Sequence, residues 1–401
     1  MELIINSALE SYFYDKVSVG GEVSSWFNAR LTSAEKVSRS LNGKSLKEHL
    51  ESDTTSSDQL SELLRLKGTN LVKLLQSGVD REKLDIFLSQ MVFENRFKSS
   101  DVSLLTNSLK DKFGLDIIPY FNDWYSSKKL PGFIIKDIEL FKVMDNDRMR
   151  YQVIFKISNP EDITGLTDVR FRFGGRRFFE DRSPVEEPER IVKLEPGQTK
   201  EVGIVLDSEP NIVYMNPGIA QNIPLAYAHR FEDTELRENY KPFNGEKILN
   251  RGLDILEENE FIVDNEDDSF SAKGITEKSF LQKIIHGDNK KEEKEFTRFR
   301  FWNPPDQWEL VKSTGFYGKY VYSALYIQSG QGDRRAQWEA NLEESGNYSV
   351  FTYIANKFSF GRREIYDENL GEFQYTIYHD DGENEILIDW LKAEEGWNLL
   401  G

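Results

Sequence analysis

The chain has 401 residues, and at roughly 150 residues per domain this length indicates two or three domains. It carries 51 Lys and Arg against 69 Asp and Glu, a formal charge of −18, which counts against nucleic acid and anionic lipid headgroups as partners. The absence of Cys excludes disulfide bonds, thiolate catalysis and Cys-ligated zinc.

Aromatic residues make up 13% of the chain, which favours a folded and β-rich protein over a disordered one. No apolar run approaches the ~20 residues of a membrane span, so we expect no membrane span within this chain. The first residues lack both the basic region and the apolar stretch of a signal peptide. These features are typical of a cytoplasmic protein or of a piece of a longer one.

Between residues 33 and 126 the apolar residues recur at three and four positions, which predicts helices with one apolar side. Ser100 and Asp101 are suited to cap a helix over residues 102–113, and Gly114 follows it. We therefore interpret residues 1–130 as a helical bundle.

At residues 130–132, Leu-Pro-Gly, the period changes from helical to two, and residues 151–157 alternate between apolar and polar. Short strands at this spacing predict a small immunoglobulin-like β-sandwich over residues 131–210. Pro217, Pro224 and Pro242 lie among polar residues further on, so we expect residues 211–254 to be a connector.

A second β region is predicted over residues 255–401. Its clearest hairpin joins strands near residues 373–378 and 385–390 through the turn Asp380-Asp381-Gly382. The predicted fold class is thus α+β and multidomain, with a helical bundle, a small β-sandwich and a larger C-terminal β-sandwich.

The residue types that carry common chemistry are scattered. The four histidines are distant in sequence and the zinc motif H-E-x-x-H does not occur; they are His49, His229, His286 and His379. Asp264, Glu266 and Asp268 alternate like calcium ligands, but the expected glycine is replaced by Ser269, which favours an ordinary acidic turn. We expect no metal site and no cofactor in this chain, and no catalytic site is visible.

Five of the seven tryptophans lie in the last β region. We expect Trp338, which lies inside an alternating strand, to pack in a core. Trp302 and Trp308 flank Asn-Pro-Pro-Asp in a predicted loop and are the better candidates for binding a ligand at the surface, for example by stacking on sugar rings.

Several short motifs occur in the same order as in one enzyme family. They are Leu-Lys-Gly at residues 66–68, the leucines at 71, 74 and 75, the helix over 104–115, Phe-Asn-Asp-Trp-Tyr at 121–125 and Leu-Pro-Gly at 130–132. This order resembles the end of the catalytic region in gluzincin aminopeptidases of the aminopeptidase N type, followed by their small β-sandwich. The resemblance implies that zinc and its ligands would lie upstream of Met1.

In that family a catalytic tyrosine, which stabilises the oxyanion, stands two places before the lysine. Here the corresponding residue is Arg65. Arginine is not a neutral donor at the same distance, so the departure argues for an inactive copy. The parent is accordingly interpreted as a metallopeptidase or an inactive homologue of one.

A second resemblance covers residues 261–401. Its motifs are Ile-Val-Asp-Asn at 262–265, Arg-Ala-Gln-Trp at 335–338, Glu-Ser-Gly-Asn-Tyr-Ser-Val at 344–350 and Gly-Trp-Asn-Leu-Leu-Gly at 396–401. They look like the golvesin C-terminal-type domain, a bacterial extracytoplasmic β-sandwich. The resemblance implies a periplasmic or cell-surface location, and further closing strands after Gly401.

Together these patterns predict the noncatalytic C-terminal half of a bacterial aminopeptidase-like envelope protein. Its last domain would bind a neutral surface glycan or an envelope protein. One alternative is the C-terminal portion of an active zinc aminopeptidase, in which the helices form a wall of the substrate cleft. Another is a purely structural spacer.

Overall fold

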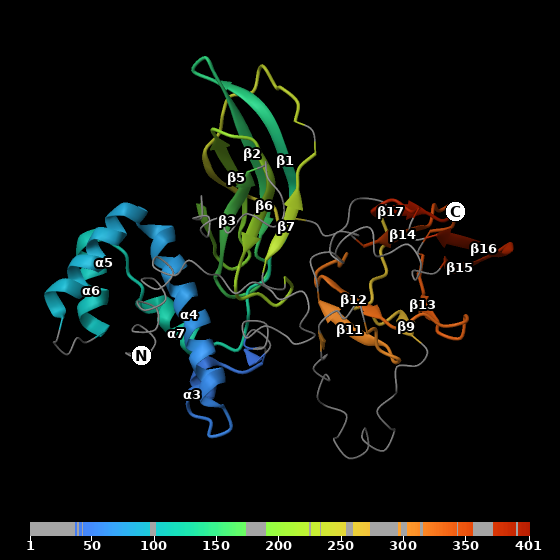
Figure 1. The fold of residues 1–401 in the computed structure, drawn as a ribbon, viewed down its shortest axis with the longest axis horizontal. Coiled ribbons are helices and arrows are strands. Elements are labelled where there is room, and N and C mark those ends of the chain that lie inside the picture. The colour runs from blue at the N-terminus through green and yellow to red at the C-terminus, as the bar shows by residue number, and fades with distance from the viewer. Residues whose placement is uncertain are drawn as a thin grey trace. The chain divides into compact units, whose positions relative to one another are not determined.

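The structure is a computed structural model with two compact units, unit 1 (Met1–Asp254) and unit 2 (Ile255–Gly401). It describes residues 37, 40–41, 43–96, 102–173, 190–223, 226–232, 234–253, 260–272, 296–297, 303–312, 316–342, 344–355, 372–389 and 392–401. Strands outnumber helices in these residues, so the chain is a β-rich multidomain protein (Figure 1).

The described helices all belong to unit 1. They are α3 (Leu46–Leu50), α4 (Ser57–Gly78), α5 (Arg81–Asn95), α6 (Val102–Phe113) and α7 (Ile118–Ser126). The predicted helix over residues 102–113 is confirmed by α6, and Gly114 follows it with a φ of 67°, the left-handed conformation that glycine adopts easily. None of the described helices is long and apolar enough to cross a membrane.

Local hydrogen bonds explain where the first helices begin. Ser45 and Glu48 form a reciprocal capping box at the start of α3. The side chain of Ser56 accepts from the Gln59 N–H at the start of α4, and Asp80 does the same for α5. These short polar side chains satisfy backbone donors that have no partner within the helix.

The helices do not form a bundle that is separate from the strands, so the predicted bundle is not confirmed. Their core extends from Leu71 and Leu75 of α4 through Leu84 and Leu109 to Leu166, which lies on a strand. The physical reason is that α4 is amphipathic and part of its apolar side packs on strands β3 (Gly165–Phe173) and β4 (Arg190–Leu194).

Unit 1 contains two antiparallel four-stranded sheets that are arranged like a sandwich (Figure 1). One sheet has the order β1 (Ile134–Asp145), β2 (Arg148–Ser158), β5 (Thr199–Leu206), β8 (Gly245–Leu249). The other has the order β4 (Arg190–Leu194), β3 (Gly165–Phe173), β6 (Pro210–Asn216), β7 (Tyr227–Arg230). Alternate residues such as Val153, Phe155 and Ile157 of β2 are fully buried, which agrees with the alternation in the sequence.

The segment 211–254 is not a connector, which corrects the prediction. It supplies most of β6 and all of β7 and β8, and Phe243 contacts β5 so closely that a Cβ at Gly203 would lie 2.5 Å from the Phe243 carbonyl oxygen. The sequence did not predict these strands because the segment contains prolines, and because the edge strands β7 and β8, with four and five residues, are too short to show a clear alternation.

One buried polar side chain fixes this segment to the sandwich. The amide of Gln152, which is fully buried, donates to the Phe243 carbonyl and accepts from the Phe243 N–H, both at 2.8 Å. We expect Gln152→Leu to destabilise unit 1 by about 2 kcal/mol, because it removes the partner of two partly buried backbone groups of Phe243. Urea unfolding measures this. The exposed Gln90→Leu should change stability by less than about 0.5 kcal/mol, and an equally small effect at Gln152 would contradict the assignment.

The described strands of unit 2 are short. They form a three-stranded sheet of β10 (Phe296–Thr297), β11 (Glu309–Lys312) and β12 (Ser323–Tyr326), and three pairs: β9 (Phe270–Ala272) with β13 (Ala336–Trp338), β14 (Phe351–Ile354) with β17 (Gly396–Leu399), and β15 (Glu372–His379) with β16 (Gly382–Asp389). The last pair confirms the predicted hairpin. These sheets do not by themselves establish a single larger sandwich.

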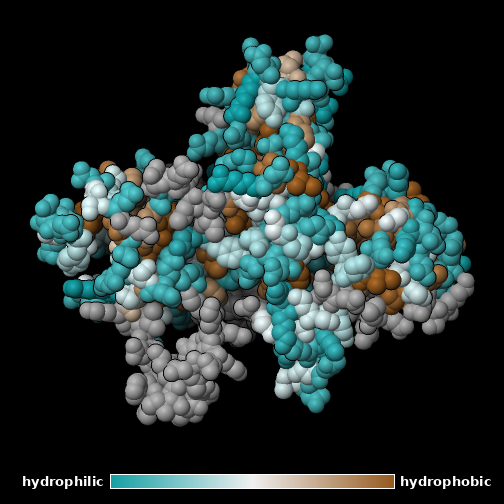
Figure 2. All heavy atoms as spheres, turned by 180° about the vertical axis from the view of Figure 1, so that it is seen from behind, coloured by the Kyte–Doolittle hydropathy of each residue, from teal (hydrophilic) through white to brown (hydrophobic). Residues whose placement is uncertain are grey.

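Many apolar side chains remain exposed on both units, and Figure 2 shows such residues on one face of the molecule as small hydrophobic patches between hydrophilic ones. Scattered exposure of this kind is ordinary for a globular protein. A patch becomes informative where several large apolar side chains share one face of a sheet.

Candidate functional site

Of the three sequence-predicted site residues, one belongs to unit 1, one to unit 2, and one lies outside the described residues. Arg65 lies on the exposed side of α4, where its guanidinium pairs with Glu62 one turn earlier. Trp308 is half-buried immediately before β11. Trp302 lies outside the described residues.

The described histidines have ordinary structural surroundings. His49 is buried, and its Nε2 lies 2.8 Å from the Ser40 carbonyl oxygen. The ring of His229 packs on Phe231, and burial lowers the pKa of His229. His379 lies at the β15–β16 turn, and His286 is outside the described residues. The described part of the chain contains no group of three side chains arranged to hold a metal ion.

The acidic run that begins at Asp264 forms a hydrogen-bonded turn. The buried Asp264 carboxylate accepts from the backbone N–H groups of Asn265, at 2.6 Å, and Lys319, at 2.8 Å. Asp267 pairs with the Lys319 ammonium at 2.6 Å. Burial raises the pKa of Asp264, and the neighbouring acids Glu266 and Asp267 add to the increase. Backbone N–H groups and the Lys319 ammonium thus donate to the carboxylates of Asp264 and Asp267, as in an ordinary acidic turn.

Strands β14 and β17 of unit 2 carry an exposed aromatic face. Tyr353 pairs with Trp397 and Phe351 with Leu399 in the register of the two strands, so these four side chains lie on the same side. Phe351, Trp397 and Leu399 are 49%, 46% and 61% exposed, whereas Ile354, whose side chain points to the other side, is buried. A sheet with one apolar exposed side is an informative exception to the usual pattern.

Tyr317 extends this face from outside the two strands. Its ring centroid lies 5.2 Å from that of Tyr353 and 4.9 Å from that of Trp397, and the latter two rings are 5.4 Å apart. The rings are tilted or edge-on to one another, which is the favourable geometry for aromatic contacts. We use "aromatic face" below for Tyr317, Phe351, Tyr353, Trp397 and Leu399.

The electrostatic surroundings of the aromatic face are acidic. Burial, followed by the charge of Asp264, raises the pKa of Tyr317 to about 12. Burial and the charge of Glu395 raise the pKa of Tyr353. Both phenols are therefore neutral at physiological pH, and the nearby carboxylates repel anionic ligands.

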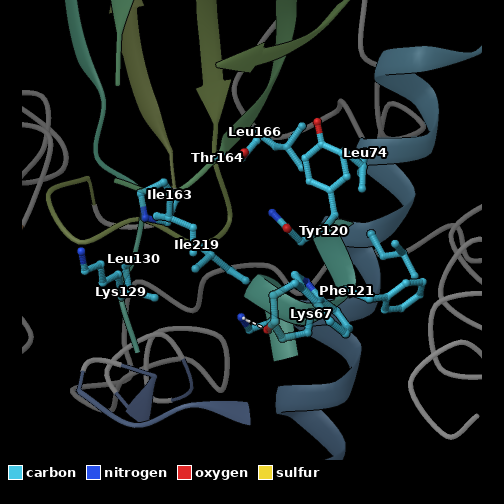
Figure 3. Close-up of a pocket in the computed structure, with 14 residues that line it drawn as sticks. Lys67, Leu74, Tyr120, Phe121, Lys129, Leu130, Ile163, Thr164, Leu166 and Ile219 are labelled. Carbon is cyan, nitrogen blue, oxygen red and sulfur yellow. Dashed lines mark hydrogen bonds between the residues drawn. The ribbon is translucent and has the colours of Figure 1, made fainter. Parts of the chain in front are cut away.

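Unit 1 contains a separate cavity of about 60 Å³ between α4, α7 and the sandwich (Figure 3). Lys67 and Leu74 of α4 and Phe121 of α7 line one side, and Ile163 and Ile219 line the other. Tyr120 and Thr164 each donate a hydrogen bond to Glu195, which links α7 to the sandwich beside this cavity. These walls combine apolar side chains with a few polar groups, as small-molecule sites do.

Lys67 is the charged group within this cavity that is most deeply buried, with 6% of its surface exposed. Its Nζ donates to the Trp124 carbonyl oxygen at 3.0 Å and lies 5.5 Å from the centre of the Trp124 ring. Burial lowers the pKa of Lys67 to about 8. Two motifs quoted above, Leu-Lys-Gly at 66–68 and Phe-Asn-Asp-Trp-Tyr at 121–125, therefore contact each other.

A second buried lysine of α4 has a different environment. The ammonium of Lys73 lies 2.8 Å from the Asp168 carboxylate on β3 and donates to the Asn216 carbonyl oxygen at 2.6 Å. Arg170 also contacts Asp168, at 2.7 Å. Burial favours the neutral form of Asp168, but the two cations outweigh it and lower its pKa. This buried ion pair holds α4 against the sandwich.

Sequence reasoning missed both the aromatic face and the cavity. Tyr317 is distant in sequence from Tyr353 and Trp397, so no local pattern brings the three rings together. A usable signal was the pair Phe351 and Tyr353, which are two positions apart in a predicted strand. Trp338, expected in a core, is instead 49% exposed, and its ring centroid lies 5.2 Å from that of Phe270.

Comparisons with known proteins add no assignment. No protein-family model matches the sequence, and no curated protein matches it. A matching solved structure is a selenomethionine-labelled β-glucosidase from Kluyveromyces marxianus, which is 18% identical over 30% of this chain. The match spans 18% of the β-glucosidase chain with a TM-score of 0.17, so this likeness carries no argument about fold or function.

Proposed function

We propose that this chain is a noncatalytic binding protein and that unit 2 binds a neutral glycan on its aromatic face. The observation that carries the proposal is the exposed side of β14 and β17, where Trp397 is half-exposed and packs on the partly buried rings of Tyr353 and Tyr317. Contiguous apolar patches that stay exposed on a folded protein mark binding surfaces.

The chemistry of this face suits a sugar ring. The apolar face of a pyranose can stack on Trp397, and burying this half-exposed ring supplies favourable free energy. Hydroxyl groups of the sugar can donate to the carboxylates around the face, whereas an anionic polymer would be repelled by them and by the net charge of −18. The same charge argument excludes stacked nucleic acid bases.

We extend this proposal with the two resemblances in the sequence. On that basis unit 2 is a larger sandwich of the golvesin type, and unit 1 is an inactive aminopeptidase-like part with a helical bundle and a small sandwich. The location is then the bacterial periplasm or cell surface. What supports this extension is the order of motifs in the sequence, together with the exposed position of Arg65.

Substitution of Trp397 tests the proposal. We expect Trp397→Ala to weaken binding of the full chain to a neutral polysaccharide at least tenfold, because central aromatic side chains contribute about 2 kcal/mol or more to such interfaces. Isothermal titration calorimetry measures the affinity. Trp338→Ala is the matched control, since Trp338 is exposed to the same degree but lies on β13.

Trp338→Ala should leave the affinity within about twofold of the original chain. Circular dichroism of both variants shows whether the fold is retained. If the two variants lose affinity equally, or if Trp397→Ala binds as well as the original chain, the aromatic face is not the glycan site.

A further inference from the structure

The cavity in unit 1 contains a buried cation that lacks a carboxylate partner among the described residues. Lys67 is 6% exposed, and the hydrogen bond given above leads to a neutral backbone oxygen of Trp124. Lys73, which follows on the same helix, is just as buried but pairs with Asp168. A buried ammonium without a counter-charge is costly, and an anion in the cavity would remove much of that cost.

A second polar group of the cavity points to the same kind of ligand. The indole Nε1 of Trp124 is buried and has no hydrogen-bond acceptor among the described residues. An indole N–H can only donate. Lys67 and Trp124 thus offer one charged and one neutral donor, and both would be satisfied by the two oxygens of one carboxylate.

The remaining walls restrict what else the ligand can be. Leu71, Leu74, Phe121 and Ile219 are buried apolar side chains that line the cavity. The volume is about 60 Å³. Because a water molecule needs roughly 10–15 Å³ of such space, the cavity admits about four to six non-hydrogen atoms.

We propose that this cavity binds a short aliphatic monocarboxylate, whose carboxylate accepts from the Lys67 ammonium and the Trp124 indole while its alkyl group contacts the leucines of α4 (Figure 3). The site is independent of the aromatic face, because it lies in unit 1 and uses different residues. Inorganic phosphate is a poorer fit, since it has no apolar part to place against these walls.

Nuclear magnetic resonance on the full chain tests this site. Labelling tryptophan with nitrogen-15 gives one indole signal per Trp, and Trp124→Phe identifies the signal of Trp124. Propionate is the probe, and propionamide is its neutral isostere. We expect propionate to move the Trp124 indole proton in a saturable way, and propionamide and phosphate to bind at least tenfold more weakly, because hydrogen bonds to charged groups are the stronger ones.

Two lysine variants complete the test. Lys67→Met should weaken propionate binding at least tenfold. Lys110→Met is the control, since Lys110 is exposed, pairs with Asp116 and is not among the residues that line this cavity, and it should retain the affinity. Propionate that leaves the Trp124 signal unmoved, or propionamide that binds as well as propionate, overturns the proposal. The comparison of the two probes decides the matter even if Lys67→Met does not fold.

Discussion

Replacing Lys67 by Met is expected to stabilise unit 1 at neutral pH. The pKa of Lys67 is about 8 in the folded chain and 10.5 as the ordinary value, so burying its charge costs about 3 kcal/mol at pH 7. Loss of the hydrogen bond to the Trp124 carbonyl offsets about 1 kcal/mol, which leaves a net gain of about 2 kcal/mol.

The pH dependence of stability shows whether the effect of Lys67→Met comes from the buried charge or from packing. Between pH 8 and 10.5 the unfolded chain still holds the Lys67 proton while the folded chain has released it, so this group makes the fold more stable as pH rises. The advantage of Lys67→Met should therefore shrink by about 3 kcal/mol across that window. Urea unfolding followed by the helical circular dichroism signal reports on unit 1, where the described helices lie.

Lys129→Met is the control for this measurement. Its ion pair with Asp162 is exposed, so its removal should change stability by less than about 1 kcal/mol at any of these pH values. A Lys67→Met variant that is less stable than the original chain at pH 7, with an unchanged difference at high pH, would contradict the assignment of an unpaired buried charge.

Lys73→Met should have the opposite effect and destabilise unit 1 by about 3–5 kcal/mol. Removing one partner of a buried ion pair leaves the other charge buried, and Asp168 has no exposed surface. Arg170 contacts the other carboxylate oxygen of Asp168, and this remaining contact reduces the loss. The same urea titration measures the change.

A double-variant cycle attributes this loss to the pair. Lys73→Met combined with Asp168→Leu should recover most of the stability, because apolar side chains can replace a buried pair at little cost. Lys110→Met, which removes an exposed pair with Asp116, should change stability by less than about 1 kcal/mol. Additive losses in the double variant would show that Lys73 and Asp168 are not coupled.

Lys67 and Lys73 lie on the same helix but have different partners. Both lie on α4 and both are buried, yet one meets a carboxylate on β3 and the other faces a cavity. Stability alone would favour an apolar residue at position 67. A carboxylate ligand accounts for a lysine there, because the ligand supplies the missing counter-charge.

Much of the regular structure was predictable from local patterns. The alternation over residues 151–157, the helix over 102–113 and the turn at Asp380-Asp381-Gly382 all correspond to described elements. Gln152 shows the limit of such patterns. Its polar side chain predicts an outward position, but it is buried because Phe243, far along the chain, supplies its partners.

The candidate sites were less predictable for the same reason. Trp302 and Trp308 were predicted as binding residues because they flank a proline-containing loop. The aromatic face instead consists of residues from three separate segments of the chain. The burial of Lys67 follows from the packing of α7 and the sandwich against α4, and no spacing in the sequence records it. Long-range packing decides which polar residues lose their contact with water.

Direct binding of the full chain to polysaccharides tests the proposed function most simply. A depletion assay would mix the chain with insoluble neutral polysaccharides from bacterial cell surfaces and, in parallel, with acidic ones. We predict retention on a neutral polymer, release of Trp397→Ala from it, and no retention on acidic polymers. Retention on none of the neutral polymers, or equal retention of Trp397→Ala, would contradict the account.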